Sequence, residues 1–143
     1  MAALVVRLWR RVHEPRAISV LYLVQYLTLT AAGGYALWRP PSSIEGAYGA
    51  GAMLTLAALL VVGGLIGAIA VLPGKYELER LAVIGVALAS LIYVIVIVGL
   101  HATSSGNRLL QAGFVAVVLL HQGVRWVRIK DRPFRPRPHT VEA

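Results

Sequence analysis

The sequence contains no cysteine among its 143 residues. This absence excludes disulfide bonds, iron–sulfur clusters and thiolate metal sites. The four histidines do not have the spacing of metal ligands, and no glycine-rich phosphate-binding loop occurs. We therefore expect no metal and no cofactor.

Acidic residues are few, with six Asp and Glu in total. All six are predicted to lie outside the membrane spans: Glu14, Glu45, Glu77, Glu79, Asp131 and Glu142. General acid–base catalysis needs positioned titratable groups, and no buried pair of carboxylates is expected here. We therefore predict that the protein is not an enzyme and has no catalytic residues.

Charged residues make up only 14% of the chain, whereas apolar residues make up 58%. Soluble proteins have about 25% charged and about 45–50% apolar residues. A soluble domain of this length could not bury so much apolar surface. The excess must face lipid.

Four continuous apolar segments account for this excess. They cover about residues 17–38, 47–72, 81–100 and 109–127, and each is close to the roughly 20 residues that cross a bilayer as a helix. Their apolar residues run continuously instead of alternating, which excludes a membrane β-barrel. The sequence predicts an all-α fold, an integral membrane four-helix bundle formed by residues 17–127.

Turn-forming and helix-capping residues separate the predicted spans. Pro40 and Pro41 follow the first span, and Ser42 with Glu45 has the spacing of a capping box at the start of the second helix. Pro73 and Gly74 are expected to end that helix. A cleaved signal peptide is the alternative for residues 17–38, but 22 apolar residues exceed the usual 7–15 of a signal peptide.

Lysine and arginine are distributed unevenly between the two sides of the predicted membrane. Of the 14 in the chain, all but Arg39 and Arg108 fall in the N-terminal segment, the loop between the second and third spans, or the C-terminal end of the chain from Arg125 onward. Because cytoplasmic segments carry the excess of Lys and Arg, both termini are predicted to be cytoplasmic, with the protein in a bacterial inner membrane. The location of these charges at span ends favours contact with anionic lipid headgroups over nucleic acid.

The two ends of the chain have different predicted roles. Residues 1–16 are expected to form an interfacial amphipathic helix, with a basic face opposite Val5, Leu8, Trp9 and Val12; a positive flank that only fixes orientation is the alternative. Residues 128–143 are expected to form a disordered basic tail, because three prolines prevent a regular helix. The residues predicted to contact lipid headgroups are Arg7, Arg10, Arg11, Arg125, Arg128, Lys130 and Arg132.

Polar residues inside the predicted spans are the candidate functional residues. They are Gln25, Ser90, Tyr93, His121 and Gln122. For Gln25 and Ser90 we favour hydrogen bonds between helices over a transport site. His121 and Gln122 are expected to make a polar contact with another helix, with pH sensing as the lesser alternative. The Arg125 side chain is expected to extend to the membrane surface.

Small residues recur at four-residue spacing, which lets helix backbones approach closely. The predicted packing residues are Gly63, Gly67, Gly85, Ala89, Ala112 and Ala116. The pair Gly63 and Gly67 is predicted to form the tightest helix contact, either within one chain or between chains. A homo-oligomer is the expected assembly.

Several short strings resemble those of small four-span membrane proteins of actinobacterial phages, some of which are holins or holin-like. The strings are Glu14-Pro15-Arg16-Ala17, Pro40-Pro41-Ser42-Ser43-Ile44-Glu45-Gly46, Leu72-Pro73-Gly74 and Leu78-Glu79-Arg80. The resemblance covers most of the chain, from about residue 14 to residue 128. Arginine also far outnumbers lysine, which is typical of GC-rich genomes.

The resemblance implies a protein that oligomerises and permeabilises the inner membrane during host cell lysis. The scarcity of polar residues in the spans argues against a large water-lined hole; a hole would be small or lined mainly by Gln25, Ser90, Tyr93 and Gln111. The alternative function is that of a non-enzymatic membrane partner or accessory subunit that acts by helix–helix contact. A small transporter is a third hypothesis, but the predicted spans hold no charge that could couple transport to ions.

Overall fold

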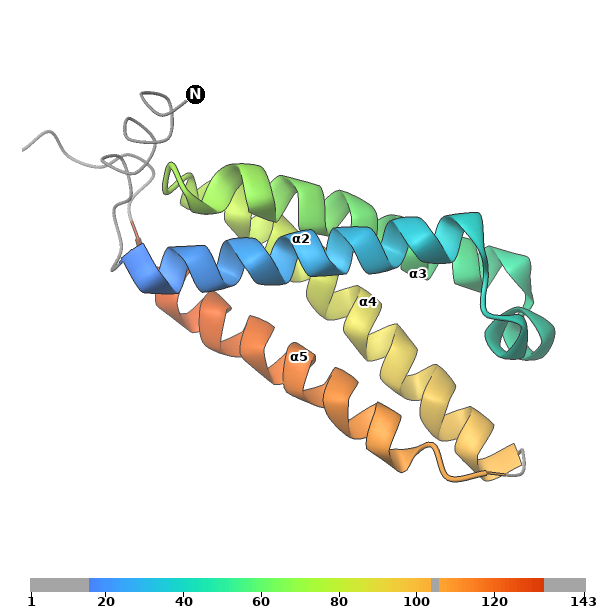
Figure 1. Cartoon of the computed structure of the whole chain (residues 1–143). Helices are drawn as coiled ribbons and strands as arrows, with labels where there is room; N and C mark the ends of the chain where they lie inside the picture. The colour runs from blue at the N-terminus through green and yellow to red at the C-terminus, as the bar shows by residue number, and fades with distance from the viewer. Residues whose placement is uncertain (1–15, 104–105, 133–143) are drawn as a thin grey trace, which may run out of the picture.

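The computed structural model describes residues 16–103 and 106–132, which form four α-helices (Figure 1). These are α2 (Arg16–Trp38), α3 (Ser42–Val71), α4 (Tyr76–Thr103) and α5 (Leu109–Ile129). All four are long and apolar enough to cross a membrane. The predicted all-α four-helix bundle is therefore confirmed, and its four helices are candidate membrane spans. Residues 1–15 and 133–143, and with them most of the predicted interfacial helix and tail, lie outside the described residues.

Two helices are at least four residues longer than the predicted spans. α3 and α4 each begin five residues before the predicted apolar span, at Ser42 and Tyr76. Their 30 and 28 residues extend over about 42–45 Å at about 1.5 Å per residue, which exceeds the roughly 30 Å of a hydrocarbon core. The start of α4 thus adds a helical turn that holds Glu77 and Glu79.

The start of α3 differs from the predicted capping box. Pro41 is the N-cap residue, and no side-chain hydrogen bond caps the helix. The Pro41 carbonyl accepts hydrogen bonds from the N–H groups of Ile44 and Glu45 instead. Gly49, seven residues after Ser42, has φ +83° and ψ +161°, which kinks α3. Only glycine adopts this backbone conformation readily, so the kink depends on a glycine at position 49.

Helices adjacent in the chain pack against each other: α2 on α3, α3 on α4 and α4 on α5. At one end of the bundle α2 begins, α3 connects to α4 and α5 ends (Figure 1). We call this the basic end, because Lys75, Arg80, Arg128, Lys130 and Arg132 belong to the segments there. At the other end, the α2–α3 connection and the α4–α5 connection lie apart (Figure 1).

Three glycines of α3 bring it close to both of its neighbours. A Cβ added at Gly63 would lie 3.2 Å from the backbone N of Val86 in α4, and one at Gly67 would lie 2.5 Å from the Tyr26 ring in α2. Gly63 and Gly67 therefore face different helices, and the prediction that they form one contact is wrong. Gly64 is the partner of Gly67 on the α2 side, because its added Cβ would lie 2.8 Å from the Tyr26 carbonyl oxygen.

The other predicted packing residues lie on or near helix interfaces. A Cβ added at Gly85 would lie 3.6 Å from the Cα of Gly63, across the α3–α4 contact. Ala89 and Ala112 are buried, and Ala116 is half-buried. Small residues thus face each other across the α3–α4 contact at Gly63 and Gly85.

Candidate functional site

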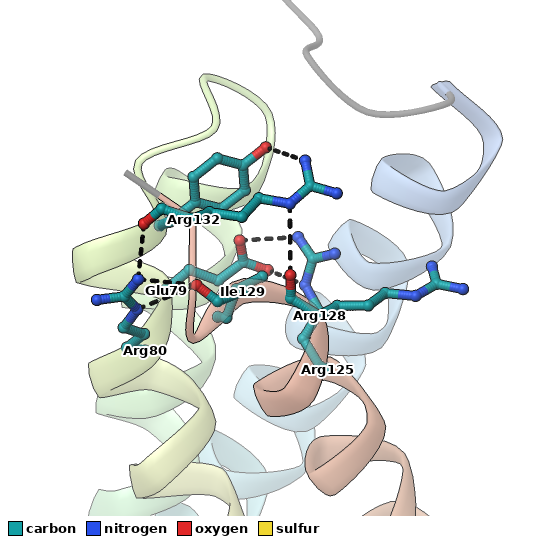
Figure 2. A network of polar contacts seen from close by, with 7 residues as sticks. Glu79, Arg80, Arg125, Arg128, Ile129 and Arg132 are labelled. Atoms are coloured by element: carbon teal, nitrogen blue, oxygen red, sulfur yellow. Dashed lines mark hydrogen bonds and ion pairs between the residues drawn. The ribbon is translucent and has the colours of Figure 1, made fainter. Parts of the chain in front are cut away.

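A buried ion pair joins α4 to α5 at the basic end (Figure 2). Nε of Arg125 donates a hydrogen bond to Oε1 of Glu79 at 2.7 Å, and Nη2 donates to Oε2 at 2.8 Å. Both side chains are 0% exposed. Two parallel charge-assisted hydrogen bonds are the strongest geometry available to a guanidinium and a carboxylate.

This pair overturns two of the sequence predictions. Glu79 was expected outside the spans and Arg125 at the lipid headgroups, yet both are buried. Arg125 lies one turn before the end of α5, and Glu79 lies in the first turn of α4. Because the two helices are antiparallel neighbours, these positions fall at the same depth. Each charge alone would be costly to bury, whereas together they satisfy one another.

Aromatic side chains extend this cluster to α2. The guanidinium carbon of Arg125 lies 4.4 Å from the centroid of the Tyr22 ring, a cation–π contact. The Tyr22 ring also stacks on His121 with centroids 4.9 Å apart and planes at 10°. Three helices therefore meet around Tyr22. The predicted contact of His121 with another helix is present, although its partner is an aromatic ring.

A second layer of contacts fastens the end of α5 to the start of α4 (Figure 2). Nε and Nη2 of Arg80 donate to the Ile129 carbonyl at 3.2 and 2.8 Å, and Nη2 also donates to the Arg132 carbonyl. These carbonyls come from the last turn of α5 and the turn after it, where the regular helical donors end, and the Ile129 carbonyl also accepts from the Arg132 N–H at 3.2 Å. Arg132 in turn donates from Nη1 to the Tyr76 hydroxyl at 3.0 Å. Arg80 thus acts as a C-terminal cap that comes from a different helix.

The remaining intramembrane polar residues lie in different surroundings. Ser90 is buried, and it lines a cavity of about 170 Å³ to which all four helices contribute residues. The Tyr93 hydroxyl accepts a hydrogen bond from Nε2 of Gln111 at 2.6 Å. Gln122 is fully buried, but its amide oxygen and nitrogen have no hydrogen-bond partner within the part of the chain that the structure describes. The polar contact predicted for Gln122 is therefore not found there.

The basic residues predicted to contact lipid divide into two groups. The Arg125 side chain is buried in its ion pair with Glu79 and is therefore not exposed to lipid headgroups. Arg128, Lys130 and Arg132 are exposed at the basic end, so headgroup contact remains a prediction for them. Arg7, Arg10 and Arg11 lie outside the described residues.

The ion pair has a structural role, which is to join α4 and α5. Both carboxylate oxygens of Glu79 accept hydrogen bonds from Arg125, so the pair holds α4 and α5 together in a medium where water cannot compete. Within residues 16–103 and 106–132, no three His, Asp or Glu side chains gather as metal ligands would. Searches among protein-family models, curated proteins and solved structures found no match to this chain.

Proposed function

We propose that this multi-pass membrane protein is not an enzyme and acts by contact of its exposed helix faces with other transmembrane helices. The observation that carries this proposal is the outward face of α5. Gly113 and Gly123 lie on it, and a Cβ added at either would meet no atom within 4 Å. Leu120, between them along the helix, is 70% exposed. Small residues beside large apolar ones are typical of the surfaces on which membrane helices associate.

The partner that we propose for this face is α5 of a second copy. Gly113, Ala116, Leu120, Gly123 and Val127 follow each other at three- and four-residue spacing and therefore lie on one stripe of the helix. The stripe contains no charged residue, so it does not require a partner of opposite charge. A two-fold contact requires only that such a patch be complementary to itself.

Disulfide crosslinking in membranes tests this assembly. Because the chain has no cysteine, a single introduced cysteine is the only reactive thiol. We expect Leu120→Cys to give a crosslinked dimer on oxidation. Ile95→Cys is the matched control, since Ile95 is an apolar residue of α4 that is 60% exposed; it should remain monomeric.

Adding Gly123→Leu to the Leu120→Cys chain should abolish the dimer, because a large side chain would keep the two backbones apart. Equal crosslinking at positions 120 and 95, or a dimer that survives Gly123→Leu, would contradict assembly through α5.

A holin-like function is the narrower form of this proposal, and the resemblance in the strings around Pro41, Pro73 and Glu79 favours it. Self-association is the step that a holin needs before it opens the membrane. The contacts of the candidate lining residues count against a large hole. Ser90 is buried, and Tyr93 and Gln111 hydrogen bond to each other. A water-lined hole would therefore require these helices to repack after assembly.

Induced expression in a bacterial host distinguishes a protein that permeabilises the membrane from one that only assembles in it. A holin-like protein should cause, after a delay, a sudden loss of membrane potential and growth arrest, and co-expression with an endolysin should convert arrest into lysis. Gln25→Leu should change the timing if that residue lines the lesion. Membrane potential that stays intact at high expression would contradict the holin-like function and leave assembly without permeabilisation.

A further inference from the structure

A groove between α2 and α5 opens at the basic end and has a volume of about 390 Å³. Its apolar lining consists of Ile18, Leu21 and Val124, and its polar lining consists of Gln25, His121 and Arg128. Tyr22 lies in the same groove and is held by Arg125 and His121. The ion pair with Glu79 fixes Arg125, so this wall of the groove is formed in advance of any ligand.

The charge in the groove is positive. Arg128 is exposed, and Figure 2 shows its side chain extending away from the Glu79–Arg125 pair toward α2. The nearest acidic residue along the chain, Asp131, is itself exposed and lies 3.9 Å from Lys130. Arg128 is therefore available to an anion at the mouth of the groove.

The deeper polar groups lie about two turns inside the mouth. Gln25 is seven residues beyond Ile18 on α2, and His121 is seven residues before Arg128 on α5, which is about 10 Å along each helix. Among the described residues, Oε1 of Gln25 is buried and accepts no hydrogen bond. A half-turn about its terminal bond would present Nε2 as a donor instead. Either orientation offers a hydrogen bond to a polar group that enters the groove.

We propose that this groove binds one anionic phospholipid from the leaflet at the basic end. The phosphate pairs with Arg128, and the glycerol, ester groups and upper acyl chain extend inward along Leu21 and Val124 toward His121 and Gln25. A free phosphate ion would leave those apolar side chains uncovered, whereas a lipid satisfies both the charge and the apolar walls. This binding does not depend on the proposed self-association.

Native mass spectrometry of the detergent-released protein tests the proposal, with phosphatidylglycerol and phosphatidylcholine as the two probes. We expect wild-type protein to retain one phosphatidylglycerol in preference to phosphatidylcholine. Arg128→Gln should weaken that retention roughly fivefold or more, because one basic side chain contributes on that order toward an anionic lipid surface. Lys130→Gln removes the same charge two residues away, outside the groove, and should change retention little.

A second variant tests the groove without changing charge. Val124→Trp fills the apolar wall, and Val124 is 53% exposed, so the larger side chain is tolerated by the fold. We expect this variant to lose the retained phosphatidylglycerol. Equal retention of the two lipids, equal weakening by Arg128→Gln and Lys130→Gln, or full retention by Val124→Trp would each overturn the proposal.

Discussion

Arg125→Met is expected to lower the free energy of unfolding by about 3–5 kcal/mol, the usual cost of breaking a buried ion pair by removing one partner. The methionine side chain fills much of the same space, so the loss comes from Glu79, which is 0% exposed and would lose both hydrogen bonds from the Arg125 guanidinium. Its carboxylate would then have to remain charged without Arg125 or take up a proton. Unfolding by SDS in mixed micelles, followed by circular dichroism, measures the change.

Lys130→Met is the control for this variant. Lys130 lies five residues further along the chain at the same end of the bundle, and its side chain is 47% exposed. Its ion pair with Asp131 at 3.9 Å is of the surface kind that contributes at most about 1 kcal/mol. If both variants lost the same free energy of unfolding, the Glu79–Arg125 ion pair would not be buried from water.

Gly64→Leu is expected to have the second-largest effect, a loss of about 3 kcal/mol, which is the upper end of the usual cost of overpacking. Its Cβ alone would lie 2.8 Å from the Tyr26 carbonyl oxygen and 3.0 Å from the Thr30 backbone N. Backbone atoms cannot rotate out of the way as a side chain can, so α2 and α3 would have to separate. The same SDS titration measures this loss.

Gly34→Leu is the matched control, because Gly34 is in α2 and a Cβ added there would meet no atom within 4 Å. Leucine is the better helix former by roughly 1 kcal/mol, so stability should stay the same or rise slightly. If Gly34→Leu destabilised the protein as much as Gly64→Leu, the close approach of α2 and α3 at Gly64 would be wrong.

The four spans were predictable because apolar content along one helix is a local property of the sequence. The helices α3 and α4 begin five residues before the predicted apolar spans. Hydropathy marks the part of a helix that lies in hydrocarbon, whereas backbone hydrogen bonding continues into the polar boundary. The turn 76–80 therefore lies outside the predicted apolar span although it belongs to α4.

The buried ion pair was missed because its two halves are 46 residues apart. Arg125 taken alone resembles a residue that extends to the membrane surface, and Glu79 taken alone resembles a favourable charge at a helix start. The sequence did contain a usable signal. The two opposite charges lie about one turn inside facing ends of consecutive antiparallel helices, where each is within reach of the other.

The glycines of α3 show a similar limit. Their spacing correctly indicated close packing, but it did not say toward which helix each one points. That direction depends on the rotation of α3 between α2 and α4, which is set by all of its contacts together. Gly63 and Gly67 consequently belong to different interfaces.

A double-mutant cycle on Glu79 and Arg125 tests most directly whether a dry ion pair fastens α4 to α5. Glu79→Leu and Arg125→Met are each expected to cost about 3–5 kcal/mol, because each removes the oppositely charged partner of a buried charge. The chain with both substitutions should be more stable than the sum of the two losses implies, by about 3 kcal/mol or more. Additive losses, with no such recovery in the double variant, would contradict the pairing of these two side chains.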